Sequence, residues 1–471
     1  MPAPHAMGDG APRVAVVGGG ITGLTVALRL RRAEPPIDVV ALESADRAGG
    51  ELRTVEVGGI ELDAGADSFF GRKPEATELC RELGLETTKP AASGTWLWTR
   101  RGLVEYPTGT AFGIPADLGD LFRWPGLTGA GRRRAALDLV KRKRSTGAGD
   151  ETLGALLRRR LGDEATDLAL APVLGGLFGG DVDELSVEAT FPELPRWERR
   201  QGSLIRGAQA ALRDARKGTP TPPLLVRPLG GPTAISNELA ARLGSSVRLG
   251  AHVVGIEASG SGWNLRSTGG SDAADAVVFA VDAVSAARLL ADVADGVVAD
   301  LEGIPNVSVG EVLLVYGEGT AGAVPAGAGF AAPPGTTPMA SCTWTSSVWP
   351  DPSFGSRAVL RCAIGGAGQE DVLDAEDDEI VEACARHLAA VLPLPETPRS
   401  SAVVRWRDAV PRYLLGHVER AARIREGLPV GIFVCGRSFD GVDIAACVRG
   451  ATETAERVRA FVRNDDRERI S

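Results

Sequence analysis

A glycine-rich turn between two apolar runs constrains the fold of this chain more than any other feature. The turn has the pattern GxGxxG over residues 18–23. The continuous β-branched run Val14–Val17 before it predicts a buried parallel strand. Helical apolar spacing over Ile21–Leu30 predicts a helix after the turn, and Ile37–Leu42 predicts a second strand. The stretch therefore predicts a βαβ unit.

Each glycine of the turn is expected to have a specific role. Gly18 allows the tight turn, Gly20 lets backbone N–H groups approach a pyrophosphate, and Gly23 lets the helix pack close to the strand. The helix N-terminus then faces the phosphates with its positive end. Glu43, where the second strand ends, is placed to accept hydrogen bonds from an adenosine ribose. Because every part occurs in the required order, we predict an adenine dinucleotide site rather than a βαβ turn that binds nothing.

Composition limits the other possibilities. The 471 residues, with 44% hydrophobic content, can bury more than one core, so we expect two or three domains. The formal net charge of -9 argues against nucleic acid as a bulk partner. The 6 cysteines and 4 histidines lack metal-site or disulfide spacing, so we expect no metal and a reducing compartment. No apolar segment precedes the first strand and no run could span a bilayer, which predicts a cytoplasmic protein, at most peripheral to a membrane.

The stretch after Glu43 favours FAD over NAD, although both use the opening motif. A second glycine pair, Gly49 and Gly50, follows the cation Arg47 and suits the remainder of a long dinucleotide. Near the C-terminus a predicted strand leads into residues 435–442 and then a helix. The N-terminus of that helix is expected near the flavin pyrimidine carbonyls, where it would stabilise negative charge on reduced flavin. The alternative interpretation of this tail is a packing strand and helix.

The predicted elements indicate an α/β fold, α+β in parts, whose Rossmann-like FAD-binding domain is built from discontinuous segments. We assign to this domain residues 12–75, 219–292 and 398–465. Residues 76–110 and 293–397 are strand-rich and form a substrate-binding domain. Residues 111–218 have helical periodicity and form a helical insert.

A basic cluster lies on a predicted helix of that insert. Its members are Arg132, Arg133, Arg134, Lys141, Arg142, Lys143 and Arg144. The preferred interpretation is a solvated face, and the alternative is contact with an anionic membrane surface.

Segments along nearly the whole chain resemble the flavin-dependent porphyrinogen oxidases, within the amine oxidase and protoporphyrinogen oxidase superfamily. The segments shared with the superfamily are VAVVGGGITGL and DRAGG. The narrower resemblance is carried above all by GGDVDELS and PRYLLGH. Further matching stretches are GADSFFGRKPE, LRRRLGDE, CTWTSSVWP and FDGVDIAACV. Within this branch the chain is most similar to the bacterial type associated with coproporphyrinogen III.

The resemblance implies non-covalently bound FAD and three two-electron oxidations of a cyclic tetrapyrrole in haem biosynthesis, giving coproporphyrin III. Dioxygen would reoxidise the flavin and yield hydrogen peroxide. Because the flavin takes the hydride, no side chain is assigned as catalytic. The alternatives are protoporphyrinogen IX, an amine or a carotenoid as substrate, and a flavin-binding scaffold protein of the haem pathway. Expected partners are the tetrapyrrole, dioxygen, and transiently a ferrochelatase-type protein or a membrane surface, with the chain a monomer or dimer.

The match to the family's motifs also implies cofactor residues. Around the ADP half these are Gly18, Gly20, Ile21, Thr22, Gly23, Glu43, Ser44, Arg47, Gly49 and Gly50, with Val253 on the adenine-side strand. Around the flavin they are Gly65, Ala66, Asp67, Ser68, Trp406, Gly436, Val442, Asp443 and Ile444.

Four residues are candidates for binding the substrate. Arg72 and Lys73 could pair with a propionate, because Arg captures carboxylates bidentately and Lys serves as a point charge. The alternative is a surface cation pair before a helix. Leu177 and Phe178 could sandwich the macrocycle, and the alternative for both is a place in the core.

Two departures from the family pattern bear on activity. Glu51 stands where the family usually has Lys or Arg, and Arg53 is expected to take over that role. The tail has GVDIAAC where the family usually has GVGIPDC, which puts Asp443 at a glycine position. A carboxylate there, if it pointed at the flavin O2 position, would disfavour anionic reduced flavin.

Overall fold

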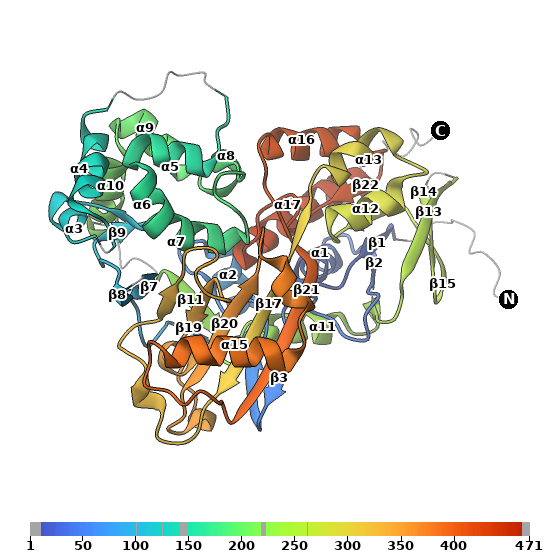
Figure 1. Ribbon diagram of the computed structural model, residues 1–471. Coiled ribbons are helices and arrows are strands. Elements are labelled where there is room, and N and C mark those ends of the chain that lie inside the picture. The colour runs from blue at the N-terminus through green and yellow to red at the C-terminus, as the bar shows by residue number, and fades with distance from the viewer. Residues whose placement is uncertain are drawn as a thin grey trace.

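The structure is a computed structural model that describes residues 11–99, 101–124, 126–141, 149–217, 223–260 and 262–463. Three parts can be followed in Figure 1. A parallel sheet with flanking helices lies on the side of the chain termini, a larger sheet covered by one helix lies below it, and a helical cluster lies apart from both. The boundaries of the three predicted domains stay a prediction.

A five-stranded sheet forms the centre of the first part. Its order is β12 (Val247–Arg248), β2 (Asp38–Leu42), β1 (Arg13–Val17), β16 (Ala276–Phe279) and β22 (Ile432–Val434). Every neighbouring pair is parallel. The carboxyl ends of strands from distant parts of the chain therefore meet at one edge, which is where open α/β sheets bind ligands.

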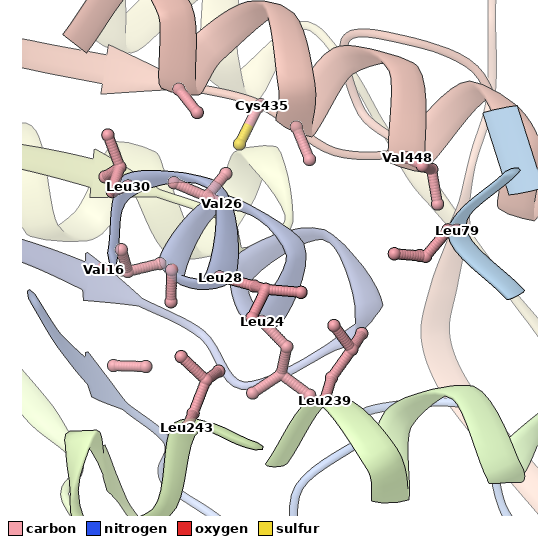
Figure 2. Close-up of a cluster of buried hydrophobic side chains, with 14 of the residues drawn as sticks. Val16, Leu24, Val26, Leu28, Leu30, Leu79, Leu239, Leu243, Cys435 and Val448 are labelled. Carbon is pink, nitrogen blue, oxygen red and sulfur yellow. The ribbon is translucent and has the colours of Figure 1, made fainter. Parts of the chain in front are cut away.

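Helices cover one face of this sheet. α1 (Ile21–Arg31) packs between the sheet, α11 (Thr233–Leu243) and α17 (Ile444–Arg463). Figure 2 shows Leu24 and Leu28 of α1 near Leu239 of α11, and Val448 of α17 beside Leu79. α1 is buried along most of its length because it contacts neighbours on several sides. The opposite face carries α12 (Ala283–Leu290), α13 (Asp295–Glu302) and α16 (His417–Gly427). The antiparallel strands β13 (Val253–Ser259), β14 (Gly262–Ser267) and β15 (Gly270–Ala274) join the same core.

The larger sheet has seven strands. Their order is β21 (Ser400–Pro411), β17 (Asn306–Val315), β20 (Val359–Gly365), β19 (Ser341–Thr343), β18 (Gly329–Ala331), β7 (Thr95–Thr99) and β8 (Gly102–Glu105). α15 (Asp377–Ala389) covers one face, and the hairpin of β3 (Thr54–Val57) and β4 (Ile60–Asp63) packs on the other. β21 pairs with β17 in this sheet. The predicted FAD-binding segment 398–465 therefore begins with a strand that contributes to the sheet of the other part.

Short elements connect the two sheets near their junction. β5 (Phe69–Phe70), β11 (Leu225–Pro228) and β6 (Thr87–Thr88) form a small antiparallel sheet. α2 (Pro74–Leu83) follows β5, and its side chains Ala76, Leu79, Cys80 and Leu83 are buried in the core around α1. Arg72 and Lys73 thus lie in the turn between β5 and α2.

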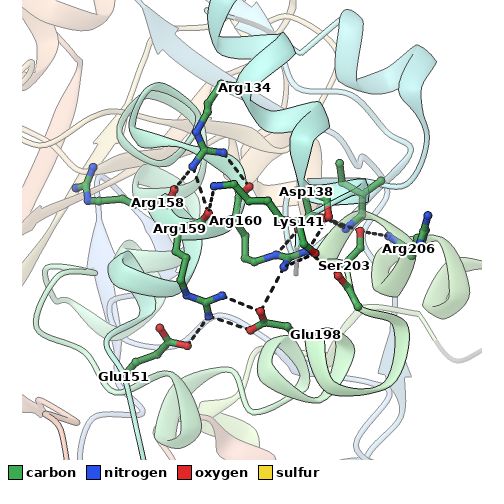
Figure 3. A network of polar contacts seen from close by, with 12 residues as sticks. Arg134, Asp138, Lys141, Glu151, Arg158, Arg159, Arg160, Glu198, Ser203 and Arg206 are labelled. Atoms are coloured by element: carbon green, nitrogen blue, oxygen red, sulfur yellow. Dashed lines mark hydrogen bonds and ion pairs between the residues drawn. The ribbon is translucent and has the colours of Figure 1, made fainter. Parts of the chain in front are cut away.

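The helical part folds around an apolar core of its own. Its helices include α3 (Leu118–Phe122), α4 (Gly129–Ala136), α5 (Leu153–Leu161), α6 (Asp163–Ala165), α7 (Ala171–Gly175), α8 (Val187–Thr190), α9 (Glu193–Gln201) and α10 (Leu204–Lys217). A polar network lies inside this part (Figure 3). The side chains of Asp138 and Arg160 form an ion pair there and are both 0% exposed.

Two members of the predicted basic cluster, Arg134 and Lys141, bind backbone carbonyls of this part, and Arg133 is exposed. The guanidinium of Arg134 donates to the carbonyls of Arg158 (2.9 Å) and Arg160 (3.1 Å), and Lys141 Nζ donates to the Arg159 carbonyl (2.7 Å). These cations therefore bind carbonyls in the last turn of α5, at the negative end of the helix dipole. Arg142, Lys143 and Arg144 lie outside the described residues.

All 6 cysteines are buried, as the sequence predicted, and they are free thiols in this structure. Within the described ranges, no three His, Cys, Asp or Glu side chains are grouped so that they could hold a metal ion. No helix in the same ranges is long and apolar enough to cross a membrane.

Candidate functional site

A cleft of about 760 Å³ opens at the carboxyl ends of the parallel strands and reaches the face of the seven-stranded sheet. Most of the predicted site residues line it. These are Gly18, Gly20, Ile21, Thr22, Glu43, Ser44, Gly49, Gly50, Gly65, Ala66, Leu177, Val253, Trp406, Gly436, Val442 and Ile444. The fold thus brings together residues from widely separated segments of the chain. The predicted residues outside this lining are Gly23, Arg47, Asp67, Ser68, Arg72, Lys73, Phe178 and Asp443.

The first glycine turn is packed backbone against backbone. Gly18 has φ of +108° and donates its N–H to the Leu42 carbonyl (2.8 Å). A Cβ on Gly18 would lie 2.6 Å from the Ala280 carbonyl oxygen, and one on Gly23 would lie 2.0 Å from the Gly18 carbonyl oxygen. Gly23 therefore allows α1 to approach the strand, which is the reason predicted for it, while lying behind the cleft.

A second turn packs directly against the first at the wall of the cleft. Gly49 donates its N–H to the Gly19 carbonyl (2.8 Å), and Gly49 and Gly50 both have positive φ. The guanidinium of Arg47 donates to the carbonyls of Gly50 and Leu52. Arg47 thus holds this second turn in shape from behind.

The groups at this end of the cleft suit an adenine dinucleotide. Gly20 is the N-cap of α1 and, among the described residues, no side chain caps this end, so the first N–H groups and the positive end of the helix face the cleft. Glu43 accepts the N–H groups of Gly19 (2.6 Å) and Ala45 (2.8 Å), which holds its carboxylate at the cleft wall. Glycine backbone, a helix N-terminus and an acid at a strand end are the groups that a dinucleotide requires.

The other end of the cleft is formed by the seven-stranded sheet and residues 64–66. Trp406 Nε1 donates to the Ala64 carbonyl (2.9 Å), and Arg361 Nη1 donates to the Gly65 carbonyl (2.9 Å). Asp67 and Ser68 point away from the cleft. Ser68 Oγ donates to the Asp67 carboxylate (2.7 Å), which lies 3.5 Å from Arg361.

Asp443 caps a helix instead of lining the cleft. Its Oδ1 accepts the N–H of Ala446 (3.1 Å) at the start of α17. Its Oδ2 accepts a hydrogen bond from Lys73 Nζ at 2.6 Å. Both carboxylate oxygens are therefore occupied within the protein, so the concern that this acid points at the flavin O2 position is not supported. The same contact ties Lys73 to α17.

The other substrate candidates are split between surface, cleft and core. Arg72 is exposed. Leu177 is 50% exposed and lines the cleft. Phe178 is buried and packs its ring against Phe191, with the ring centroids 5.3 Å apart. A macrocycle held between Leu177 and Phe178 is therefore incompatible with this placement, because Phe178 is a core residue.

Comparisons with known proteins identify the kind of protein that carries this cleft. The family model described as flavin containing amine oxidoreductase matches residues 21–459. The chain belongs to this family. A coproporphyrinogen III oxidase of Bacillus subtilis (strain 168) is 30% identical over 461 residues, covering 94% of this chain and 97% of the relative. One of Mycobacterium tuberculosis (strain ATCC 25618 / H37Rv) is 33% identical over 450 residues, covering 93% and 95%.

A solved structure has the same architecture. The crystal structure of a provisionally named protoporphyrinogen oxidase from Exiguobacterium sp. 255-15 superposes with a TM-score of 0.84 at 26% identity, covering 96% of this chain and 100% of that one. Membership of the flavin family makes this chain an oxidoreductase, and its dinucleotide cradle identifies the flavin as FAD. The predicted fold class and cofactor are thereby confirmed. The assignment of single residues to parts of FAD stays a prediction.

An ion pair that the sequence did not predict lies within this flavoprotein cleft. Glu51 forms a hydrogen-bonded pair with Arg437, which also donates to the Ala409 carbonyl, and both side chains line the cleft. Burial raises the pKa of Glu51 above its ordinary value, and Arg437 opposes that shift. Arg53, which was expected to supply the cation, is exposed. The cation is instead Arg437, in the loop after β22. Folding brings it into contact with Glu51 although the two residues are 386 positions apart in the sequence.

Proposed function

We propose that this flavoenzyme oxidises coproporphyrinogen III to coproporphyrin III in haem biosynthesis. Three two-electron steps would each pass a hydride to FAD, and dioxygen would reoxidise the flavin and leave as hydrogen peroxide. The observation that carries the proposal is near-full-length similarity to coproporphyrinogen III oxidases at 30% and 33% identity. The preference for the tetracarboxylate over protoporphyrinogen IX belongs to the proposal, as does any transient contact with a ferrochelatase-type protein or a membrane surface.

FAD supplies the hydride acceptor when it is bound, so the chain itself must hold, orient and enclose the macrocycle. Leu177, Val309 and Val410 give the cleft apolar wall area. Arg72 and Lys73 are our candidates for a propionate. The ammonium group of Lys73 is partly exposed and already lies against a carboxylate, that of Asp443. A propionate would therefore form with Lys73 the same kind of ion pair that the Asp443 carboxylate forms with it.

An anaerobic mixing experiment tests the proposed function. Oxidised holoenzyme is mixed with coproporphyrinogen III, and flavin absorbance and porphyrin fluorescence are followed before and after air is admitted. We expect the flavin to bleach and porphyrin to accumulate. A flavin that stays oxidised would overturn the proposal. Protoporphyrinogen IX in a parallel experiment decides between the two porphyrinogens, and equal or faster bleaching with it would remove the preference for the tetracarboxylate.

The double replacement of Arg72 and Lys73 by Ala should weaken binding of the tetracarboxylate. Hydrogen bonds to charged groups contribute about 1.5–3 kcal/mol, so we expect KM for coproporphyrinogen III to rise by about 10-fold to 100-fold. The rise for protoporphyrinogen IX, which carries fewer carboxylates, should be smaller. Lys89→Ala, which removes another exposed lysine, is the control and should leave both KM values unchanged. Equal rises for both substrates would contradict the propionate assignment.

A further inference from the structure

A carboxylate lies on β17, the second strand of the seven-stranded sheet. Glu311 is the central acid of β17, paired with Ala363 of β20 and with Val404 of β21. Side chains alternate along a strand, so Glu311 shares its face with Val309 and Leu313. Val309 and Glu311 both line the FAD cleft. A glutamate beside the apolar side chains of Val309 and Leu313 is costly to bury unless its charge is compensated.

The partners of Glu311 do not satisfy it fully. Its side chain is 15% exposed, and its Oε2 lies 3.4 Å from Arg361 Nε. No residue in the described part of the chain makes a hydrogen bond to that buried oxygen. Arg361 is shared, because its Nη1 donates to the Gly65 carbonyl and lies 3.5 Å from Asp67. One guanidinium therefore faces two carboxylates.

The neighbouring elements add one more pair. Asp63, at the end of β4, lies 3.1 Å from Arg227 of β11. Within the described residues, the group around Glu311 thus holds the carboxylates of Asp63, Asp67 and Glu311 against the guanidiniums of Arg227 and Arg361. The carboxylates exceed the cations by one. A single proton taken up from the cleft would balance the charge.

Burial and charge decide which acid takes that proton. Burial raises the pKa of Glu311 to about 7, against the opposing effect of Arg361. Burial also raises the pKa of Asp63, to about 6. Burial alone would raise the pKa of Asp67 too, but Arg361 and the Ser68 hydroxyl hold that pKa below its ordinary value. Of the three acids, Glu311 lines the FAD cleft and holds a proton most readily near neutral pH.

We propose that Glu311 is the proton acceptor of this cleft, taking the N–H proton that a pyrrole ring loses when the adjoining methylene bridge gives up its hydride. The inference rests on the proposed function. In each step the C–H bond breaks and both its electrons leave with the hydrogen for the flavin. In two of the three steps an N–H bond also breaks, its electron pair enters the new conjugated double bonds, and an O–H bond forms on Glu311. In the remaining step the proton that Glu311 accepts comes from a bridge carbon, because the porphyrin keeps two of the four N–H groups of the porphyrinogen. The macrocycle loses two electrons and two hydrogens, and the flavin is reduced by two electrons. Glu311 then releases its proton to solvent, while dioxygen takes the electrons.

Glu311→Gln keeps the shape of the side chain and removes its basicity. We expect the anaerobic bleaching of the bound flavin by coproporphyrinogen III to slow by about 100-fold, the lower end of what a general base contributes. In the wild type this rate should rise with pH through an inflection near 7, because the base must be deprotonated. That inflection should vanish in Glu311→Gln. Glu61→Gln, which replaces an exposed acid on β4, should behave as the wild type does.

A measurement without FAD keeps the proposal testable if the variant fails to bind the cofactor. Infrared spectra of the FAD-free wild type should show one more carboxyl group losing its proton between pH 6 and 8 than those of Glu311→Gln, because Asp63, with a pKa of about 6, titrates in both proteins. The folded-state pKa of Glu311 lies above its ordinary value of 4.5, so its contribution to stability is lost as pH rises toward 7. The melting temperature of Glu311→Gln should therefore rise relative to that of the wild type as the pH is increased from 5 to 8.

Two results would overturn the assignment of Glu311. One is bleaching of Glu311→Gln within twofold of wild type with the inflection intact. The other is an FAD-free wild-type protein whose carboxyl titration between pH 6 and 8 equals that of Glu311→Gln. Wild-type holoenzyme that fails to bleach at all would instead overturn the proposed function, so the two failures are distinguishable.

Discussion

Gly23→Ala is expected to leave a protein that binds FAD about 100-fold more weakly than the wild type. The added Cβ would lie 2.0 Å from the Gly18 carbonyl oxygen, a distance at which backbone must move. Overpacking of this kind costs about 1–3 kcal/mol, and about 2.8 kcal/mol corresponds to 100-fold in affinity. The displaced group is the turn whose N–H groups would meet the pyrophosphate, so the loss falls on the cofactor. The flavin-to-protein ratio of the purified protein and an FAD titration of the stripped protein measure it.

Gly296→Ala is the matched control for that replacement. Gly296 lies in the first turn of α13, and a Cβ built on it has no atom within 4 Å. The same chemical change should therefore leave FAD binding untouched, and it should stabilise slightly because Ala is the better helix former. A Gly23→Ala protein that purifies with a full complement of flavin would contradict the packing argument.

Asp138→Ala should destabilise the helical part by about 3–5 kcal/mol, the usual cost of removing one partner of a buried ion pair. Asp138 accepts hydrogen bonds from Arg160 Nε, from Ser203 Oγ and from the Ile205 N–H (2.9 Å). Arg160, which is 0% exposed, would keep its charge in an apolar core and lose its main carboxylate partner (Figure 3). Thermal unfolding and the rate of limited proteolysis within residues 111–218 measure the effect.

Glu188→Ala is the control for Asp138→Ala. It breaks the ion pair of Glu188 with Arg199 (3.1 Å) in the same helical part, where the two side chains are 37% and 47% exposed. Exposed pairs contribute at most about 1 kcal/mol, so the melting temperature should hardly change. If both replacements cost the same, burial is not what makes the Asp138 network important. Replacing Asp138 by Leu together with Arg160 by Met should recover part of the loss, because the unpaired charge is then removed as well.

The dinucleotide half of the fold could be predicted closely from local patterns. The expected strand Val14–Val17 corresponds to β1, the expected helix from Ile21 to α1, and the expected tail helix to α17. These elements have strong apolar periodicity and glycine boundaries, and both signals are local. The pairing of β21 could not be predicted, because a strand's own sequence does not identify its partner. Its pairing with β17 depends on a contact across about 90 residues of chain.

The candidate site also has parts that the sequence predicts and parts that it does not. Backbone-mediated parts of the site, such as the turns at Gly18–Gly23 and Gly49–Gly50, follow from residue type, since only glycine tolerates those conformations and contacts. Side-chain pairings did not follow from the sequence. Lys73 with Asp443 and Glu51 with Arg437 join residues 370 and 386 positions apart. Glu311 is the exception, because the sequence shows it as the one acid within the largely apolar stretch NVSVGEVLLV.

The sequence by itself therefore determined that this chain builds a βαβ cradle and, through its family motifs, that the cradle holds FAD. Tertiary structure alone decided what each charge near the cleft does. Asp443 is the clearest case, since its position in a flavin motif suggested an effect on the flavin, whereas its contacts make it a helix cap that holds Lys73. The physical reason is the separation along the chain over which each kind of interaction acts. Backbone conformation is governed by neighbours in sequence, but the role of a charge is set by the partners and burial that folding brings to it.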